Sequence, residues 1–376
     1  MTDIMLNRCR TLTRAMSLVS CLLLAPASQA VNTPNTVSVA NLQHRAEQGI
    51  VEAQYRLGWS YAMGVGVEQD YQQALAWYRK AAEQGHAEAQ YRLGWSYAMG
   101  VGVEQDYQQA LAWYRKAAEQ GHAEAQYRLG WSYAMGVGVE QDYQQELAWY
   151  RKAAEQGHAE AQFNLGRIYT LGQGVAPDNQ QAVAWYRKAA DQGIAAAQVN
   201  LGWMYNQGQG VVQDHQQAVT WYRKAAEQGT AAAQFFLGLM YHQGQGVAQD
   251  HQQAVAWYRK AAEQGYAAAQ FRLGGMYEIG LGVGQDYKQA LAWYRKAAEQ
   301  GDDEAQRALG LMYATGDGVA QDYQQAYAWA SSAVANGGNA DTVKLRDLIA
   351  KKLTPNALAQ AQALGGEYFK KYRPRN

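Results

Sequence analysis

The sequence has almost no cysteine, and no excess of charge of either sign. Only Cys9 and Cys21 occur among its 376 residues, so the chain beyond residue 30 cannot form disulfides or thiolate metal sites. The 33 basic residues balance 33 acidic ones. Removing residues 1–30 takes away three basic residues and one acidic residue, which leaves 30 and 32, a formal charge of −2. This balance gives no electrostatic reason to expect nucleic-acid binding.

Long apolar runs are also absent, and none approaches the ~20 residues of a membrane-spanning helix. The mostly apolar stretch 15–25 is preceded by Arg8, Arg10 and Arg14 and followed by a small-x-small motif that ends at Ala30. This order is typical of a secretory signal peptide, so residues 1–30 are predicted to be removed on export. The expected location is the periplasm or the outside of the cell.

Lipoprotein processing at Cys21 is an alternative, because residues 18–21 read Leu-Val-Ser-Cys. Little apolar sequence precedes Cys21, however, and Leu22, Leu23 and Leu24 continue the apolar run beyond it. Lipid anchoring is therefore the less favoured interpretation.

A 36-residue repeat dominates the rest of the chain. The dipeptide Trp-Tyr recurs at 77, 113, 149, 185, 221, 257 and 293, and Trp329 occupies an eighth position. Residues 89–124 repeat residues 53–88 letter for letter, and residues 125–160 differ from them only at Glu146. Such a period predicts units that stack on one another into a solenoid.

Each unit reads as two helices. In residues 89–124 the first helix has the apolar stripe Ala89, Leu93 and Tyr97, with Gly94 inside it for close packing against a neighbouring helix. The second helix has an apolar stripe at Ala110, Trp113, Tyr114, Ala117 and Ala118. The invariance of its Trp-Tyr pair among units predicts a structural role for that pair.

Glycine and aspartate mark the helix ends. Gly100 and Gly102 end the first helix, and Gly121 ends the second. Asp106 is predicted to be the N-cap of the second helix, with Gln109 completing a capping box.

These residues resemble a known family. The pattern Ala-Gln-Tyr-x-Leu-Gly-x-x-Tyr, Gly-x-Gly-Val, Asp, then Ala-x-x-Trp-Tyr-x-Lys-Ala-Ala-x-Gln-Gly is similar to Sel1-like repeats, which are relatives of tetratricopeptide repeats. The resemblance covers residues 53–340 and implies an all-α fold, an α/α solenoid that forms a right-handed superhelix of eight helix-turn-helix repeats. It also implies protein–protein recognition for most members, and the absence of cysteine separates this chain from a disulfide-rich branch linked to β-lactams.

The segments on either side of the repeats differ from them. Residues 31–52 are expected to form a short lead-in and a partial repeat, and residues 341–376 a helical cap with a basic tail. In the cap, Thr354 and Pro355 start a last helix. The apolar positions expected to face inward in the two cap helices are Leu345, Leu348, Ile349, Leu353, Leu358, Ala361, Gly365, Tyr368 and Tyr372.

A second face of the first helix varies between units, while the core stripe does not. The resemblance to tetratricopeptide arrays implies that first helices line a concave groove, and Trp, Arg and Met are typical of interface cores. The positions Met204, Met240 and Met276 fit either this groove or the core between repeats. The predicted partner-binding residues are Arg56, Trp59, Arg92, Trp95, Arg128, Trp131, Asn164, Arg167, Asn200, Trp203, Phe236 and Arg272.

No catalytic, cofactor or metal site is predicted. His86, His122 and His158 follow the repeat, each with a Glu two residues later, and are expected to be exposed turn residues. Copies one repeat apart are too far from one another to share a metal. The Gly-Gln-Gly turns lack the preceding strand and the Lys-Ser/Thr of a phosphate loop.

The sequence therefore favours an exported scaffold or adaptor that binds other proteins in envelope assembly, signalling or host contact. Peptidoglycan-associated partners and self-association are both compatible with it. The alternative function is binding or hydrolysis of cell-wall or β-lactam-type ligands, by analogy with the disulfide-rich branch.

Overall fold

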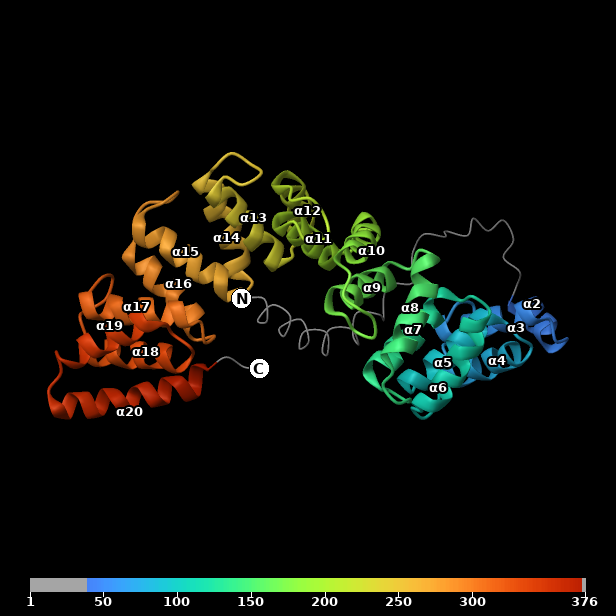
Figure 1. The fold of residues 1–376 in the computed structure, drawn as a ribbon. Helices are drawn as coiled ribbons and strands as arrows, with labels where there is room; N and C mark the ends of the chain where they lie inside the picture. Colours follow the sequence, from blue (N-terminus) through green and yellow to red (C-terminus); the bar gives the residue numbers. More distant parts are fainter. Residues whose placement is uncertain (1–38, 374–376) are drawn as a thin grey trace. The chain divides into compact units, whose positions relative to one another are not determined.

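The computed structural model describes residues 39–373, and every regular element among them is a helix (Figure 1). The predicted signal peptide, Cys21 and Arg375 of the basic tail lie outside the described residues. The first helices of the eight repeats are α3 (Val51–Met63), α5 (Ala87–Met99), α7 (Ala123–Met135), α9 (Ala159–Leu171), α11 (Ala195–Gln207), α13 (Ala231–Gln243), α15 (Ala267–Ile279) and α17 (Asp303–Thr315).

The second helices alternate with them: α4 (Tyr71–Glu83), α6 (Tyr107–Glu119), α8 (Tyr143–Glu155), α10 (Asn179–Asp191), α12 (His215–Glu227), α14 (His251–Glu263), α16 (Tyr287–Ala298) and α18 (Tyr323–Ala335). Three helices flank the repeats, namely α2 (Val39–Glu47), α19 (Ala340–Ala350) and α20 (Pro355–Tyr372). The predicted all-α architecture of eight two-helix repeats is confirmed.

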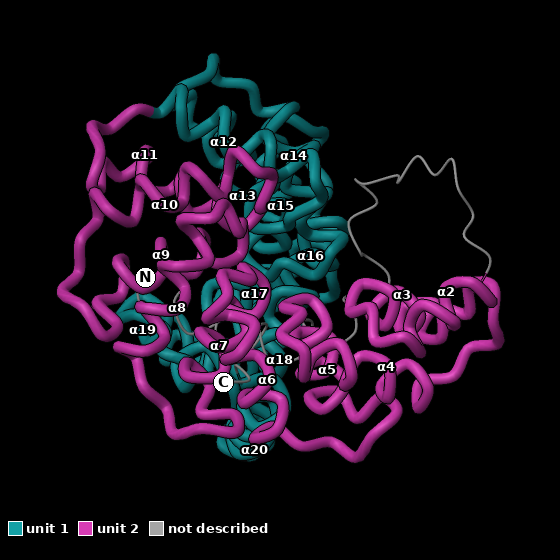
Figure 2. The backbone as a smooth tube through the Cα atoms, turned by 90° about the vertical axis from the view of Figure 1, so that its right-hand side faces the viewer, with its two compact units in different colours: residues 1–31, 215–376 teal, residues 32–214 magenta. Residues whose placement is uncertain are grey.

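The described residues divide into two compact units (Figure 2). The N-terminal unit contains residues 39–214 and the C-terminal unit residues 215–373. Within each unit a helix packs against the helix before it and the helix after it. Because consecutive helices pack together within each unit, most contacts there are repeated at the 36-residue period.

Each turn inside a repeat is built around two glycines in the left-handed conformation. In the second repeat, Gly100 has φ 69° and Gly102 has φ 73°. A Cβ at Gly102 would lie 2.5 Å from the carbonyl oxygen of Tyr71 in the preceding repeat. Glycine is therefore required at this position both for its backbone angle and for the close contact between repeats.

Asp106 is the N-cap of α6, as predicted, and its Oδ1 accepts hydrogen bonds from the N–H groups of Gln108 and Gln109. The predicted capping box is wrong in its second half. The N–H of Asp106 donates to the carbonyl of Tyr97 at 2.9 Å, so it is already satisfied without the side chain of Gln109. The same bond joins the end of the first helix to the start of the second.

Gly94 lies against the ring of Tyr114 in the same repeat. A Cβ at Gly94 would lie 2.7 Å from Cδ1 of that ring and 3.0 Å from the carbonyl oxygen of Ala110. Tyr114 and its counterparts are buried, as is Leu93. The close packing expected at Gly94 is thus a contact with the tyrosine of the Trp-Tyr pair as well as with backbone.

The tryptophan of the pair is covered by a lysine three residues later. In the first repeat the Nζ of Lys80 lies 3.9 Å from the centre of the Trp77 ring. The equivalent distances in the next six repeats are 3.9 to 4.1 Å. A cation over an indole face is favourable, so the lysine contributes to the packing of this position.

A buried glutamine joins three successive helices. Gln90 is 4% exposed, and its Nε2 donates to the carbonyl of Ala82 at the end of α4. Its Oε1 accepts from Gln120 at the end of α6 at 2.7 Å. The same two bonds are made by Gln54, Gln126, Gln162, Gln234 and Gln270.

The cap packs against α18. Thr354 caps α20 and Pro355 is its first residue, as predicted. On the expected inner faces, Ile349 and Ala361 are buried, but Leu348 is 60% exposed and the expectation for it was wrong. The adjacent Ile349 packs into the core instead, so the two neighbouring residues lie on different sides of α19.

Candidate functional site

The first helices of the N-terminal unit carry most of the side chains predicted to bind a partner. Arg56 and Trp59 on α3 are exposed, and 38% of the surface of Trp59 is accessible. The other eight are partly buried: Arg92, Trp95, Arg128, Trp131, Asn164, Arg167, Asn200 and Trp203. None of the ten is sequestered in the core, and binding of a partner at this first-helix face stays a prediction.

Two predicted residues belong to the C-terminal unit. Phe236 on α13 is partly buried, and its ring stacks on that of Tyr222 at 5.1 Å between centroids. Arg272 on α15 is exposed.

The choice left open for the methionine series is settled by burial. Met204, Met240 and Met276 are between 1% and 3% exposed, so they belong to the core. The serines at the same position, Ser60, Ser96 and Ser132, are buried too. These positions cannot reach a partner, although they are one residue from the tryptophan of the same face.

The tryptophans of the first-helix face also hold repeats together. Trp95 packs against a core cluster that includes Leu129 of the next repeat. Trp131 packs in the same way against Leu165 and Ile168. Each ring therefore has one side on the following repeat, and the remainder of its surface is available to solvent.

An Arg–Glu–His contact joins the first-helix faces of neighbouring repeats. The Nε of Arg92 donates to Oε1 of Glu88 at 2.8 Å, and Oε2 of Glu88 lies 2.8 Å from Nε2 of His122 in the next repeat. Nδ1 of His122 accepts from the N–H of Ala125, so His122 is the N-cap of α7. Its ring stacks on Tyr91 at 4.8 Å. We call this arrangement the clasp.

Two further clasps have the same composition, at Glu52–His86 and Glu124–His158. In the clasp of Glu88, burial raises the pKa of the carboxyl, but hydrogen bonds and charges from His122 and Arg92 outweigh burial, and the pKa lies below its ordinary value. The pKa of Glu124 is lowered for the corresponding reasons. Each clasp thus contains a glutamate carboxylate, and the ion pair with this carboxylate restrains the neighbouring arginine side chain.

The expectation that the three histidines are exposed turn residues was wrong. The exposed fractions of their side chains are 21%, 17% and 11% for His86, His122 and His158. Each pairs with a Glu 34 residues earlier, because stacking brings the start of one repeat's first helix beside the first helix of the repeat before. The sequence contains a sign of this pairing, since each of the three histidines that begin a first helix has a Glu 34 residues earlier.

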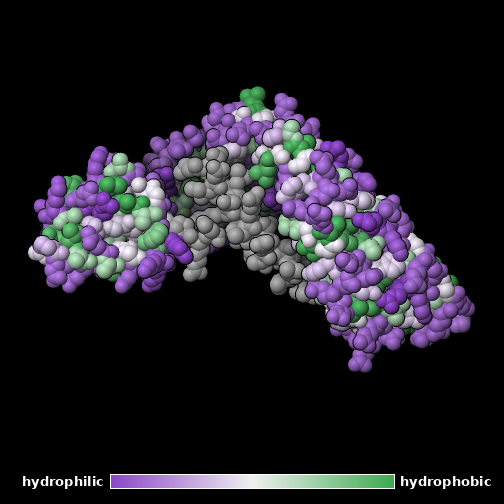
Figure 3. Space-filling view, turned by 60° about the horizontal axis from the view of Figure 1, so that its bottom comes forward, coloured by the Kyte–Doolittle hydropathy of each residue, from purple (hydrophilic) through white to green (hydrophobic). Residues whose placement is uncertain are grey.

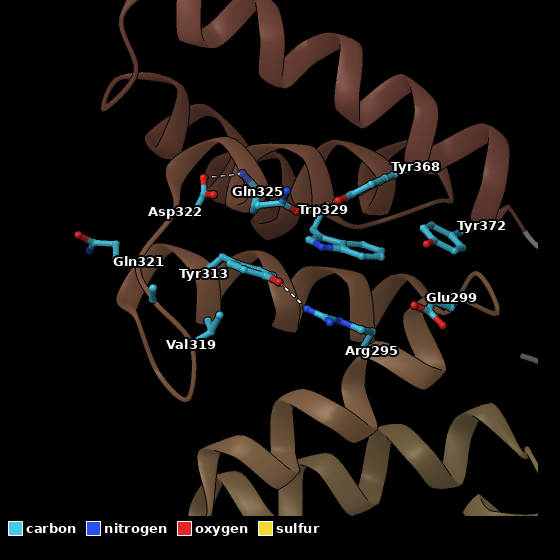
Figure 4. A pocket seen from close by; sticks show the side chains of 11 residues that line it. Arg295, Glu299, Tyr313, Val319, Gln321, Asp322, Gln325, Trp329, Tyr368 and Tyr372 are labelled. Carbon is cyan, nitrogen blue, oxygen red and sulfur yellow. Dashed lines mark hydrogen bonds between the residues drawn. The ribbon is translucent and has the colours of Figure 1, made fainter.

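A cavity of about 510 Å³ opens in the C-terminal unit between α16, α17, α18 and α20 (Figure 4). Trp329 on α18 lines this cavity. The ring centroids of Tyr368 and Tyr372 on α20 lie 4.4 and 5.4 Å from that of Trp329. Arg295 donates to the hydroxyl of Tyr313. The cavity was not predicted, because it depends on how α20 packs over the last repeat.

At Trp329 the cap replaces the lysine found in earlier repeats. Ser332 occupies the position of that lysine and is buried. The hydroxyl of Tyr368 donates to Oε1 of Gln325 at 2.7 Å. The polar groups of this cavity are therefore largely paired with one another, and its shape is a result of capping.

On the face shown in Figure 3, apolar residues form small separate patches among hydrophilic ones. No helix among residues 39–373 is both long and apolar enough to cross a membrane. Nor does any group of three or more His, Cys, Asp or Glu suited to a metal ion occur in that part of the chain.

Stacked two-helix repeats with a capped end define the chain as an α/α repeat solenoid. The family model of the Sel1 repeat matches eight consecutive segments, at residues 51–86, 87–122, 123–158, 159–194, 195–230, 231–266, 267–302 and 303–338. The chain belongs to the Sel1 repeat family.

Two solved structures are similar along most of their length. One is a protective antigen present in uropathogenic Escherichia coli strains, with 34% identity over 89% of this chain and 95% of that chain and a TM-score of 0.57. The other is a Sel1 repeat protein from Oxalobacter formigenes, with 36% identity over 82% of this chain and 89% of that chain and a TM-score of 0.63. No curated protein matches the chain.

Proposed function

We propose that the protein is an exported scaffold that binds other proteins through the first-helix face of its repeats. The observation that carries this proposal is the threefold recurrence of one exposed or half-buried Arg–Trp pair at a constant spacing. The pairs are Arg56 with Trp59, Arg92 with Trp95, and Arg128 with Trp131.

The clasps prepare the arginines for binding. Glu88 holds Arg92 at 2.8 Å, and packing against the next repeat holds Trp95. Side chains that are already ordered lose less conformational entropy when a partner binds. Arg and Trp are also the residue types that contribute most to interface hot spots.

Recurrence of the pair favours a partner that contacts several repeats at once. Near-identical repeats offer the same chemistry three times within the N-terminal unit. Contacts made in parallel add avidity without a deep pocket. A scaffold of this kind needs no catalytic group.

The proposed export rests on the signal-peptide pattern of residues 1–30. The similar Escherichia coli protein is a protective antigen, and an antigen must be met by the host, which is in keeping with an exported protein. Mass spectrometry of the protein purified from its own cells tests this. A chain that starts at Val31 supports the proposal, a lipid on Cys21 would indicate anchoring, and an intact Met1 would contradict export.

The binding proposal is tested by affinity capture. The chain and its Arg56→Ala/Trp59→Ala variant are immobilised and exposed to envelope extract, and retained proteins are identified by mass spectrometry. These two side chains are chosen because they are exposed, so their removal leaves the core intact. The control is Gln73→Ala/Glu83→Ala, two exposed residues on α4 of the same repeat.

A protein retained by the wild type and the control, but lost from the variant, would support binding at the first-helix face. Equal retention by all three forms would contradict it. Light scattering over a concentration series, run in parallel, shows whether the retained protein is a second copy of the chain itself.

A further inference from the structure

Two histidines face one another in the sixth repeat. His242 lies in the last turn of α13 and His251 is the first residue of α14. Their ring centroids are 5.2 Å apart, with an angle of 56° between the rings. The first three repeats have Ala and Tyr at the corresponding two positions.

The turn between them holds the two positions together. The N–H of Asp250 donates to the carbonyl of Tyr241 at 3.0 Å, which joins the residue before His251 to the residue before His242. The side chain of Gln249 donates to the carbonyl of His242 at 2.9 Å. The backbone of the pair is therefore fixed by the same bonds that shape this turn in other repeats.

Both rings have a buried nitrogen without a partner. Nδ1 of His242 and Nδ1 of His251 are shielded from solvent and make no hydrogen bond. The hydroxyl of Tyr258 on α14 is likewise buried and unpaired. Buried polar atoms are normally satisfied, so the two unpaired ring nitrogens of adjacent histidines are open to a shared ligand, whereas the tyrosine hydroxyl is unpaired also at Tyr222 in the preceding repeat.

The next repeat shows that the position of His242 can reach this hydroxyl. Glu278 stands there in place of His242, and its carboxylate accepts a hydrogen bond from Tyr294, the counterpart of Tyr258, at 2.5 Å.

We propose that His242 and His251 form a two-imidazole site for a divalent transition-metal cation of the kind that prefers nitrogen ligands, such as Zn²⁺ or Cu²⁺. At Zn–N distances of about 2.0–2.1 Å, a tetrahedral ion places the centroids of its two imidazoles about 5 Å apart, close to the separation found here. No group of three His, Cys, Asp or Glu suited to a metal occurs among residues 39–373, so water or a ligand from a partner completes the coordination.

The charges around the pair are compatible with this role. Burial lowers the pKa of His242, and the neighbouring His251 and Arg272 lower it further. Arg272 on α15 is exposed, so solvent screens its charge.

Titration calorimetry with Zn²⁺ on the purified, tag-free chain tests the site at pH 7.5. The variants are His242→Ala and His251→Tyr, which introduce residues that other repeats already carry at these positions. The control is His215→Tyr, the same exchange at the corresponding position of the fifth repeat. Melting temperatures without metal confirm that all four proteins fold alike.

We expect one equivalent of Zn²⁺ to bind to the wild type and to the control, and each variant to bind it about tenfold more weakly or not at all. Histidine NMR signals that shift on titration are expected to be those of His242 and His251. Absence of saturable binding to the wild type would overturn the proposal. Undiminished binding to the two variants would overturn it too, by assigning the ion to other histidines such as those of the clasps.

Discussion

The Nε2 atom of His122 lies 2.8 Å from Oε2 of Glu88, a residue of the preceding repeat. This contact places an ionisable pair at the junction between two repeats that are otherwise held by apolar packing and by a buried glutamine hydrogen bond. Because Glu88 also accepts from Arg92, one carboxylate links the structural junction to the first-helix face. Stability and binding are therefore expected to respond together to changes at Glu88.

Replacing Glu88 by Gln tests the clasp. The pKa of Glu88 lies below its ordinary value of 4.5, so its contribution to stability is present above pH 4.5 and is lost as the pH falls through the folded-state pKa. We expect Glu88→Gln to lower the free energy of unfolding by about 1 kcal/mol at pH 7, and by less at pH 3. Urea denaturation at both pH values measures the difference. Glu119→Gln, on the exposed end of α6, is the control and should change neither value.

Gly94→Ala is expected to destabilise the chain even though alanine favours a helix by about 1 kcal/mol over glycine. The added Cβ would lie 2.7 Å from the ring of Tyr114, so the ring must move out of a packed core. Overpacking of this kind costs about 1–3 kcal/mol. Gly366→Ala in α20 is the matched control, because a Cβ there meets nothing within 4 Å and should stabilise. A gain in melting temperature for both variants would contradict the packing described for Gly94.

Glu146→Ala is expected to stabilise the third repeat. Glu146 is 5% exposed and its Oε2 has no hydrogen-bond partner. Burial raises its pKa to about 7, which Arg167 offsets only in part. A raised pKa means that stability is lost as the pH rises from 4.5 through 7, so the variant should gain about 3 kcal/mol over the wild type at pH 8 and little at pH 4.

The near-identical second repeat supplies the reciprocal experiment for Glu146. Ala110 occupies the same position there and is 1% exposed. Ala110→Glu should destabilise with the same pH dependence in chemical denaturation. Equal stability of both variants and the wild type at pH 8 would show that the carboxylate is hydrated in solution.

Gln90→Leu is expected to destabilise although it makes the core more apolar. The change leaves the carbonyl of Ala82 and the amide of Gln120 without the partner they have in the wild type. An unsatisfied buried polar group costs about 1–3 kcal/mol. Thermal unfolding should show the loss, while Gln108→Leu on the exposed face of α6 should leave the melting temperature nearly unchanged.

The period of the sequence was enough to predict the helices, the aspartate N-cap of the second helix and the buried stripe. Leu93, Tyr114 and Asp106 each do what their spacing indicated, because helix geometry alone decides which side of a helix they lie on. Met204 could not be assigned in this way. On the helix surface Met204 lies between the core stripe and the first-helix face. Only the packing of the neighbouring helices decides whether it is buried in the core or exposed on that face.

Contacts between repeats were beyond prediction from spacing. The co-occurrence of His122 with a Glu 34 residues earlier is visible in the sequence, but spacing alone does not show that His122 pairs with Glu88 and not with Glu124, two residues later. The hydrogen bonds of Gln90 were missed for the same reason, since both of its partners lie on other helices. The pair His242 and His251 was missed because the irregular turn of residues 244–250 separates their helices, and the conformation of a turn does not follow from a periodic pattern.

The glutamine hydrogen bonds that join one repeat to the next use the same atoms at successive junctions, since Gln90 donates to the carbonyl of Ala82 as Gln126 donates to that of Ala118. Loss or gain of a whole unit by unequal recombination within the near-identical coding segments would therefore create no junction that the protein does not already contain. The number of repeats can therefore change by one unit at a time, while the contacts between neighbouring repeats stay the same.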